Sequence, residues 1–580
     1  MKRIYSYLKN YRIKAVMAPL FKCLEAIFEL LVPMAVASMI DTGIVRADIP
    51  YILKMGAVLL ILAFIGIACS LTAQWFAASS ASIAATGFRN ELLKHILSLD
   101  YCEIDRYGTE RFLTSMTLDI NQVQNGINMF LRLFMRSPFV VFGAAFMAFR
   151  IDKRMSIVFF VTIFILSLIV FGILLGTVPF YKKVQSEQDE IIGLSKEQIT
   201  GSRVIRAFNR QGKCCDEFEE KNRQLTAMQI FVSKISAIMN PVTALVLNLA
   251  IIVLIWNGAI YIDCGSLSKG SLVALINYMG QILVELVKFA NLIILISKAV
   301  ASDRRIEEVF SYNNQDKKEN KSDIKEKQIL NDHFKENELV SLRDIYFSYP
   351  EASEPSLSGI NFKINKNEHI GIIGGTGSGK STLAKIIAGL YKPDKGDVIY
   401  NKEAESEDKA VVRIVPQKAV MFEGSIKDNI VMGKEVSKEL INRSLCISQA
   451  EEFVLNFEDG LMHHIEQGGR NLSGGQKQRI GIARGLCMNS SVLILDDPAS
   501  ALDFATERRL RKGLLQFAEE NELTLIIISQ RAAMVKNLDK ILVMNDGRLE
   551  AVGRHDQLIK ENELYREIFL SQQKEMEVAP

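Results

Sequence analysis

The segment HIGIIGGTGSGKSTLAKIIAGL, residues 369–390, decides the fold of the second half of this chain. Its apolar start predicts a buried strand, and LAKIIAGL predicts a helix. Between them, GGTGSGKST at Gly374–Thr382 matches the pattern GxxxxGKS in a strand, loop and helix setting. Glycines allow the backbone N–H groups of such a loop to curl around phosphate oxygens, so the segment predicts a nucleotide-phosphate site.

Four side chains in and near this loop have expected tasks. Lys380 can reach the terminal phosphates as a point charge, and the Ser381 hydroxyl can hold Mg²⁺. A second buried strand, VLILDD, ends in Asp496, which we expect to orient the Mg²⁺ shell, and Asp497, expected near the attacking water. The loop residues expected at the nucleotide are Gly374, Gly375, Thr376, Gly377, Ser378, Gly379, Lys380, Ser381 and Thr382.

Composition excludes several classes of protein. The chain has 580 residues, enough for several domains with sizeable cores. Its formal net charge of +3 gives no global electrostatic reason to expect a nucleic-acid partner. Eight cysteines occur without a CxxC pair, and the six histidines show no metal-ligand spacing against them. We therefore expect reduced thiols and no zinc site.

The first half of the chain is far more apolar than the second. Residues 157–178 and 241–262 are 22-residue stretches without a charge, each long enough to cross about 30 Å of hydrocarbon as a helix. A membrane domain is therefore expected at 1–310. Its six predicted transmembrane helices lie at about 13–40, 55–78, 129–149, 155–179, 239–262 and 272–299.

Lys and Arg near the span ends predict the orientation in the membrane. Segments expected on the inner side carry nineteen of them, and the short outer connections carry six. By the positive-inside rule, the N-terminus lies in the cytosol. The two inner connections, of about 50 residues each, predict helices that continue well beyond the membrane. A polar stretch at 311–338 predicts a flexible linker, followed by a nucleotide-binding domain at 339–580.

Between the two phosphate-site motifs lies LSGGQ, Leu472–Gln476, followed by the helical run KQRIGIARGL. With these motifs the sequence resembles an ATP-binding cassette (ABC) transporter chain of the exporter type, over its whole length. The resemblance implies an α-helical membrane domain of six transmembrane helices with long cytosolic extensions, fused to an α/β P-loop domain. It also implies ATP and Mg²⁺ as cofactors, alternating access as the mechanism, and a location in the lipid bilayer of a bacterial cytoplasmic membrane.

Further positions follow from the resemblance one at a time. Tyr349 in YFSYP matches the aromatic residue on which adenine stacks. Gln417 in VPQ matches the glutamine that senses Mg²⁺, so the expected metal set is Ser381, Gln417 and Asp496. YGTERFLTSMTLDI at 107–120 and GSRVIRAFNRQ at 201–211 are similar to two intracellular loops of multidrug-type exporters. The residues that this family directs at a partner chain and its ATP are here Leu472, Ser473, Gly474, Gly475, Gln476 and Asp503.

Two positions depart from the family pattern, and both concern hydrolysis. The family places Glu after the strand-end aspartate to polarise the lytic water. This chain has Asp497 there, with a carboxylate withdrawn by a little over about 1 Å. The family also places a histidine that contacts the γ-phosphate where this chain has Gln530, which cannot carry a positive charge. We therefore expect slow hydrolysis at this site.

Two interpretations of these departures are open. Either they are drift that leaves a modestly active ATPase, or the site is built to hold ATP rather than cleave it. Because both departures weaken the same step, we favour the second. The hypothesis is a heterodimeric multidrug-type exporter of lipophilic or amphipathic small molecules, in which a second half-transporter chain supplies Glu and His. The alternatives are an importer on the same scaffold, such as one for metal chelates, and a membrane regulator that binds ATP but transports nothing.

Charged residues inside the predicted spans are the remaining functional candidates. Lys22, Glu25 and Glu29 share one face of the first span, and Glu285 and Lys288 lie one turn apart in the sixth. Internal ion pairing, or a location outside the hydrocarbon, is the interpretation that we favour. The other is a cavity wall that prefers cationic or amphipathic cargo, with Glu25, Glu29, Glu285 and Lys288 as its candidates.

Overall fold

The computed structural model describes residues 12–312, 337–350, 352–401, 410–500 and 502–578. The chain divides into two compact units, one formed by residues 1–97 and 110–311 and the other by residues 98–109 and 312–580. The short segment 98–109 therefore belongs to the second unit, although in sequence it lies between two helices of the first. The predicted linker at 311–338 lies outside the described residues except at its ends.

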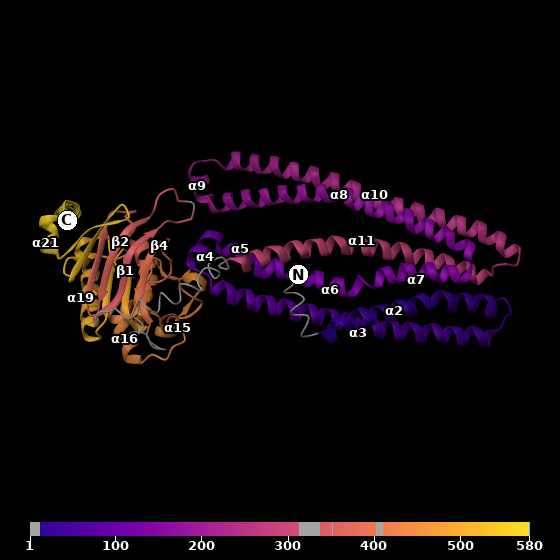
Figure 1. Ribbon diagram of the computed structural model, residues 1–580, viewed down its shortest axis with the longest axis horizontal. Helices are drawn as coiled ribbons and strands as arrows, with labels where there is room; N and C mark the ends of the chain where they lie inside the picture. Colours follow the sequence, from indigo (N-terminus) through magenta and orange to yellow (C-terminus); the bar gives the residue numbers. More distant parts are fainter. Residues whose placement is uncertain (1–11, 313–336, 351, 402–409, 501, 579–580) are drawn as a thin grey trace. The chain divides into compact units, whose positions relative to one another are not determined.

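The first unit is made of long helices (Figure 1). Among the described residues, six helical stretches are long and apolar enough to cross a membrane, which confirms the predicted helical membrane domain. The elements are α2 (Arg12–Ser38), η1 (Met39–Ile44), α3 (Ile49–Leu97), α5 (Thr109–Thr114), η2 (Ser115–Asp119), α6 (Ile120–Leu133), α7 (Arg136–Ile151), α8 (Lys153–Thr200), α9 (Ser202–Ala207), α10 (Gln211–Asp263) and α11 (Lys269–Ser311).

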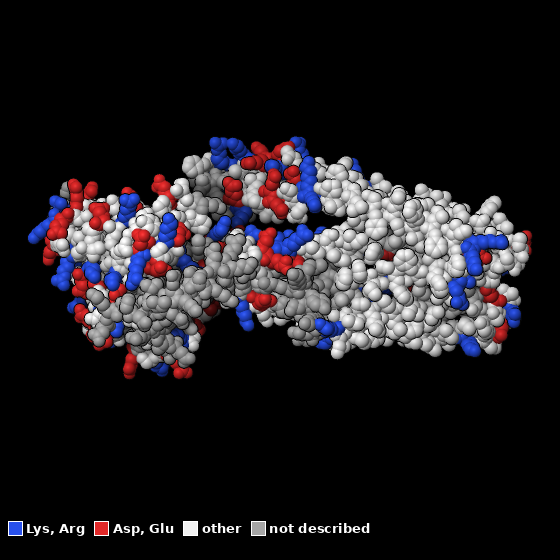
Figure 2. Space-filling view, viewed as in Figure 1, with Lys and Arg blue, Asp and Glu red and all other residues white. Residues whose placement is uncertain are grey.

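The three longest of these helices far exceed the thickness of a membrane. α3, α8 and α10 have 49, 48 and 53 residues. At 1.5 Å per residue each spans roughly 70–80 Å, against about 30 Å of hydrocarbon. On the face seen in Figure 2, charged side chains gather at the two ends of the helical unit, and the stretch between is almost free of them. The predicted helical extensions beyond the membrane are confirmed.

The third span is not one continuous helix. The sequence predicts a single span at 129–149, but α6 ends and α7 begins only at Arg136. Pro138 explains the interruption, because it has no N–H to donate to the carbonyl of Phe134 and its ring crowds that carbonyl. The break places Arg136 and Ser137 in the first turn of α7.

The helical unit has its own apolar core, built from α2, α7, α8, α10 and α11. Its buried members include Leu30, Phe159, Leu254 and Tyr278. The Tyr278 hydroxyl donates to the Leu30 carbonyl oxygen at 2.6 Å. This bond satisfies a polar group that would otherwise be costly in an apolar interior.

The second unit contains a six-stranded sheet in the order β11, β10, β3, β9, β8, β5. All neighbours pair in parallel except β10 and the edge strand β11. Along β8, Val492 and Ile494 face one apolar cluster and Leu493 and Leu495 the other, so the strand is apolar at successive positions. The strands are β3 (His369–Gly374), β5 (Ala410–Val415), β8 (Ser490–Asp496), β9 (Thr524–Ile528), β10 (Lys540–Asn545) and β11 (Arg548–Gly553).

Two layers cover the faces of this sheet. On one face lie α14 and a three-stranded antiparallel sheet in the order β2, β1, β4. On the other lie α19, α20 and α22. The elements of these layers and the adjoining helices are β1 (Glu338–Phe347), β2 (Leu357–Asn365), β4 (Lys395–Tyr400), α4 (Tyr101–Tyr107), α14 (Lys380–Ile387), α19 (Phe504–Glu520), α20 (Ala532–Val535), α21 (His555–Glu561) and α22 (Glu563–Val578).

A smaller helical lobe completes the second unit around its own apolar cluster, which includes Ile430, Leu445, Phe453 and Ile480. This architecture confirms the predicted α/β domain. The elements of the lobe are α15 (Ile426–Val431), α16 (Lys438–Ile447), α17 (Glu451–Leu455), α18 (Gly474–Cys487), η5 (Gly460–Met462), η6 (Gln467–Gly469), β6 (Gly424–Ser425) and β7 (His464–Ile465). Because β3, β8 and β9 are parallel, the loops at their carboxyl ends meet at one edge, where the site lies.

Candidate nucleotide-binding site

The loop between β3 and α14 has a backbone that requires glycine, as Gly379 and Gly374 show. Gly379 has φ 93°, in the left-handed region. A Cβ on Gly379 would lie 2.8 Å from the Ser356 carbonyl oxygen, and one on Gly374 would clash with the Met544 carbonyl oxygen. The chain therefore turns tightly enough to direct backbone N–H groups at one point before α14, an arrangement that binds phosphate.

Lys380 begins α14 and turns back over the loop. Its Nζ donates to the carbonyl oxygens of Gly374 and Gly375 at 2.9 and 2.5 Å. Burial lowers the pKa of Lys380, although the nearby carboxylates of Asp496 and Asp497 act in the opposite direction. A terminal phosphate would give this buried ammonium group a stronger, charge-assisted partner than the two carbonyls.

Ser381 and Asp496 meet beside the loop, where Ser381 Oγ donates to Asp496 Oδ1 at 3.1 Å. Burial raises the pKa of Asp496, against the opposite effect of this hydrogen bond. Hydroxyl, carboxylate and amide oxygens are the ligands that Mg²⁺ prefers, and a divalent cation would offset the burial of the carboxylate. The described residues contain no group of three or more His, Cys, Asp and Glu that could hold a metal. Ser381 and Asp496 bring two such oxygens together and Gln417 lines the same cleft, so the predicted set fits Mg²⁺.

Both backbone groups of Asp497, its N–H and its carbonyl, are hydrogen-bonded. Its φ is 50°, its N–H donates to the Ile528 carbonyl oxygen at 2.8 Å, and its carbonyl accepts from Gln478 Nε2 at 2.6 Å. The side-chain Oδ2 accepts from Gln417 Nε2 at 3.2 Å. Burial raises the pKa of Asp497, and the Gln417 hydrogen bond opposes that shift. Because the main chain is fixed, the short side chain cannot extend its reach by a backbone shift.

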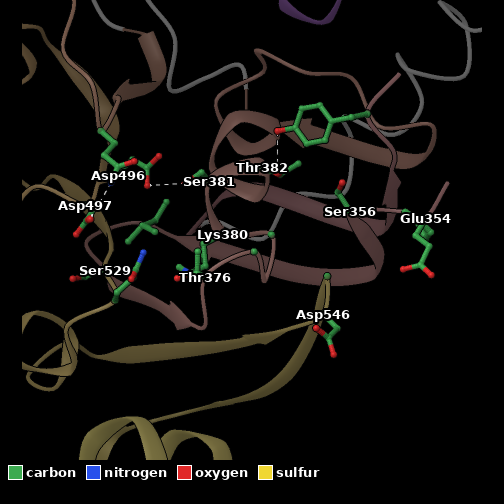
Figure 3. A pocket seen from close by; sticks show the side chains of 18 residues that line it. Glu354, Ser356, Thr376, Lys380, Ser381, Thr382, Asp496, Asp497, Ser529 and Asp546 are labelled. Atoms are coloured by element: carbon green, nitrogen blue, oxygen red, sulfur yellow. Dashed lines mark hydrogen bonds between the residues drawn. The ribbon is translucent and has the colours of Figure 1, made fainter. Parts of the chain in front are cut away.

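These residues line one cleft of about 630 Å³ (Figure 3). Figure 3 shows Asp496 and Asp497 together on one side of the cleft, facing Lys380 and Ser381. The predicted residues that line it are Tyr349, Thr376, Gly377, Gly379, Lys380, Ser381, Thr382, Gln417, Asp496, Asp497 and Gln530. The predicted Gly374, Gly375 and Ser378 belong to the loop but do not line the cleft. Seven further residues, which no motif assigns to a task, line the cleft: Glu354, Pro355, Ser356, Ile528, Ser529, Asp546 and Gly547.

Gln530 lies in the loop after β9, and the C-terminal helix α22 holds this loop. Gln572 Nε2 donates to the Gln530 carbonyl oxygen at 2.7 Å, and Gln572 Oε1 accepts from the Ala532 N–H at 2.8 Å. The neighbouring Arg531 is ion-paired at 2.5 Å with the buried Glu507, so that carboxylate is engaged. No histidine lines the cleft in the described part of the chain. Sequence reasoning misses Gln572, because nothing in its helix signals a contact 42 residues earlier.

The LSGGQ motif lies at the start of α18 and none of its five residues lines the cleft. Ser473 caps the helix, with its Oγ accepting from the Gln476 N–H and its own N–H donating to Gln476 Oε1 at 2.8 Å. Asp503 caps α19 by accepting a hydrogen bond from the Thr506 N–H, and this bond lowers the pKa of Asp503. Asp503 does not line the cleft either, while Ser473 is exposed.

The charged residues predicted inside the spans form one ion-paired network. Arg136, at the start of α7, donates to Glu29 of α2 and to Glu285 of α11, both at 2.6 Å. The two lysines pair one turn away, Lys22 with Glu25 at 2.5 Å and Lys288 with Glu285 at 2.9 Å. Each of the four cavity candidates thus has an ionic partner in the chain. The central place of Arg136 is not visible in the sequence, because the network joins three helices.

Both halves of the chain match known families. The family model described as the ABC transporter transmembrane region matches residues 16–286, and the one described as ABC transporter matches residues 357–500. An uncharacterized ABC transporter ATP-binding protein of Bacillus subtilis (strain 168), YfiB, is 32% identical over 579 residues, which cover 99% of this chain and 98% of the relative. The chain belongs to the ABC transporter family.

Two further comparisons agree with this assignment. The uncharacterized ABC transporter ATP-binding protein Rv1273c of Mycobacterium tuberculosis is 28% identical, over 98% of this ABC transporter and 97% of the relative. The solved structure of a bacterial Atm1-family ABC exporter with ATP bound has the same fold, with a TM-score of 0.77 at 18% identity, over 98% of this chain and 99% of that one.

The assignment fixes the general character of the protein. This ABC transporter chain combines a membrane domain with an ATP-binding domain, and its fold is that of a solved ABC exporter. It is a multi-pass protein of the plasma membrane, with its ATP-binding domain in the cytosol. The ATP-binding domain implies ATPase activity.

Proposed function

We propose that this ABC transporter exports lipophilic or amphipathic small molecules as one half of a heterodimer, and that its own site holds ATP but hydrolyses it slowly. The observation that carries the proposal is that Asp497 and Gln530 line the same cleft as an intact binding set. That set includes Lys380 on the phosphate loop and the Ser381–Asp496 pair. The residues expected to bind ATP are therefore kept, while the two altered residues are those expected to act in hydrolysis.

Asp497 stands where a base would polarise the lytic water. Its carboxylate is a little over about 1 Å shorter in reach than a glutamate, and a displacement of that size costs on the order of a hundredfold in rate. The hydrogen bonds of its N–H and carbonyl keep the main chain from compensating. The amide of Gln417 also donates to the carboxylate, and this hydrogen bond opposes the rise that burial gives to the pKa of Asp497.

Gln530 weakens the same step from another loop. A histidine at this position can carry a positive charge toward the γ-phosphate, where negative charge develops during cleavage. Gln530 offers only a neutral hydrogen bond, so it stabilises the charge that develops in the transition state less than a protonated histidine would. We expect both departures to leave ATP binding in place, because the sequence keeps Lys380 and Ser381, whose hydrogen bonds go to loop carbonyls and to Asp496.

The exposed cap at Ser473 and the N-terminus of α18 then serve the ATP held by the second chain. Ser381, Asp496 and Gln417 would hold Mg²⁺, which neutralises phosphate charge when it is bound. ATP binding joins the two nucleotide domains and favours the outward-open state, and hydrolysis at the second chain's site resets the pair. A membrane-embedded cavity between the two chains would carry the substrate.

The proposal is tested by measuring phosphate release from the purified chain alone and together with a candidate partner. We expect slow turnover alone and fast turnover in the pair. In the pair, replacing the partner's catalytic glutamate by glutamine should abolish turnover, while Asp497→Asn should reduce it only slightly. Lys380→Ala serves as the control that removes ATP binding at this site. Vigorous hydrolysis by the lone chain would refute the heterodimer.

Transport direction separates the proposed export from the two alternatives. Inside-out vesicles that contain the pair should accumulate lipophilic cationic dyes when ATP is added. Accumulation of a metal chelate only in right-side-out vesicles would instead support an importer. ATP binding without movement of any tested compound in either orientation would support a regulator.

A further inference from the structure

The segment 98–109 contacts the rest of its unit through two carboxylates. Asp105, on α4, accepts from the Tyr391 hydroxyl at 2.5 Å. Asp100, which precedes α4, accepts from Lys392 Nζ at 2.8 Å. In sequence this segment directly joins α3 to α5, so both carboxylates are tied covalently to helices of the membrane domain. The two contacts differ in their partners: Tyr391 is buried in the domain, whereas Lys392 is exposed.

Behind the first contact lies a buried tyrosine. Tyr391 is only 2% exposed, so its hydroxyl proton needs an acceptor within the protein. Asp105 is that acceptor, while Lys385 Nζ donates to the same hydroxyl oxygen at 3.3 Å. Burial, with the Asp105 hydrogen bond second, raises the pKa of Tyr391, so the hydroxyl remains a donor at neutral pH. Asp105 therefore orients the Tyr391 side chain through a charge-assisted bond.

Tyr391 is part of a cluster of three aromatic rings. Its ring stacks on Phe347 with centroids 5.3 Å apart, and it meets Tyr349 at 5.7 Å with the planes 88° apart. Tyr349 is also nearly perpendicular to Phe347, at 5.2 Å. Edge-to-face contacts are directional, so these two neighbours set the plane of the Tyr349 ring. A hydrogen bond of 3.1 Å between the Tyr349 hydroxyl and Thr382, dashed in Figure 3, fixes its other end.

We propose that Asp105 is a positioning residue for nucleotide-base recognition: through Tyr391 it holds the ring of Tyr349 in the plane on which adenine stacks. The inference rests on the proposed role of Tyr349 as the adenine surface. The phosphate part of the site does not depend on Asp105, because Lys380 and Ser381 bond to other residues. The contribution of adenine stacking to ATP affinity therefore depends on Asp105, which lies in the segment that joins α3 to α5.

The test compares two ligands on the full-length chain in lipid nanodiscs, ATP and inorganic tripolyphosphate, by titration calorimetry. Asp105→Ala should weaken ATP binding on the order of fivefold and leave tripolyphosphate binding unchanged. Tyr391→Phe keeps the ring but removes the hydroxyl, and it should have the same effect. The double variant should be no worse than either single one, because both remove the same bond. Asp105→Asn retains an acceptor and should bind ATP like the wild type.

Asp100→Ala is the matched control, because it breaks the other contact of the same segment without touching the ring cluster. It should leave the affinity for both ligands unchanged. Equal weakening of ATP and tripolyphosphate by Asp105→Ala, or equal effects of Asp100→Ala and Asp105→Ala, would overturn the inference in favour of a merely structural contact. Tyr349→Ala tests the adenine surface itself, since it should weaken ATP binding tenfold or more, on the order of a lost stacking contact. If it does not, the adenine surface itself is refuted, and the inference with it.

Discussion

Replacing Asp497 by glutamate in the lone chain should raise ATP turnover on the order of a hundredfold. The added methylene carries the carboxylate a little over about 1 Å farther into the cleft, and a shift of that size at a reacting group corresponds to roughly this factor. The cleft has room for it, because Asp497 is half-buried and lines the cavity. Hydrogen bonds to Ile528 and Gln478 keep the main chain in place, so the gain in length becomes a gain in reach. Adding Gln530→His should increase turnover further, since a histidine can carry positive charge near the γ-phosphate.

The assay is phosphate release by the purified full chain in lipid nanodiscs at saturating ATP, with ATP affinity measured in parallel so that kcat is separated from KM. Under the proposed function, two copies of the chain would form composite sites, because the LSGGQ motif is intact. Asp497→Asn is the matched control, because it keeps the length and the Gln417 hydrogen bond but cannot act as a base. Suppose that the glutamate variant binds ATP as tightly as the wild type yet turns over within about threefold of it. The reach of the carboxylate would then not limit the reaction, and the reasoning would be wrong.

Three other results are expected. Asp497→Asn should raise the melting temperature at neutral pH. Burial raises the pKa of Asp497, so the folded state binds a proton more readily than the unfolded state, and the ionised carboxylate lowers stability as pH rises. The neutral asparagine does not carry this cost. In a pH series of thermal unfolding, the gain should shrink as pH falls toward the ordinary value of 3.8. Arg136→Gln should lower the free energy of unfolding by about 3–5 kcal/mol, because it leaves Glu285 buried without its central partner. The double variant with Glu285→Gln should recover most of this loss. Denaturant titrations measure both effects. If Glu285→Gln leaves the transport of every cationic dye unaltered, the carboxylate has no role in cargo selection. Gln572→Ala should speed hydrogen exchange at the Ala532 amide and lower turnover by at most about tenfold, whereas Gln572→Glu, which keeps the acceptor for that amide, should protect it from exchange.

The parts of the site that are predictable from sequence are those set by short-range rules. GGTGSGKST specifies its own turn, because glycine alone accepts the backbone at Gly379 and the absence of a Cβ at Gly374 lets β10 approach. The unbroken apolar run before Asp496 indicates a strand covered on both faces, and in the structure β8 lies between two apolar clusters. The unusual residues Asp497 and Gln530 are visible in the sequence only because motifs around them mark their positions.

The parts that escape sequence reasoning are contacts between elements far apart in the chain. Pro138 signals a break in the third span, but only the fold shows that the break presents Arg136 to carboxylates of two other helices. Gln572 lies in a helix without a motif, and its role at the Gln530 loop depends on where α22 packs. Asp105 is an ordinary surface-type residue in sequence, and Tyr391 follows the phosphate-loop helix without any pattern that links the two.

The sequence by itself determined the family, the membrane-spanning character and the identity of the residues around the phosphates, because hydropathy and backbone sterics act over a few neighbouring residues. The tertiary structure alone decided which charges pair inside the helical unit, how Asp497 is held and which aromatic rings stand behind Tyr349. Those arrangements depend on packing, where each contact joins groups that are brought together only when the whole apolar core has formed.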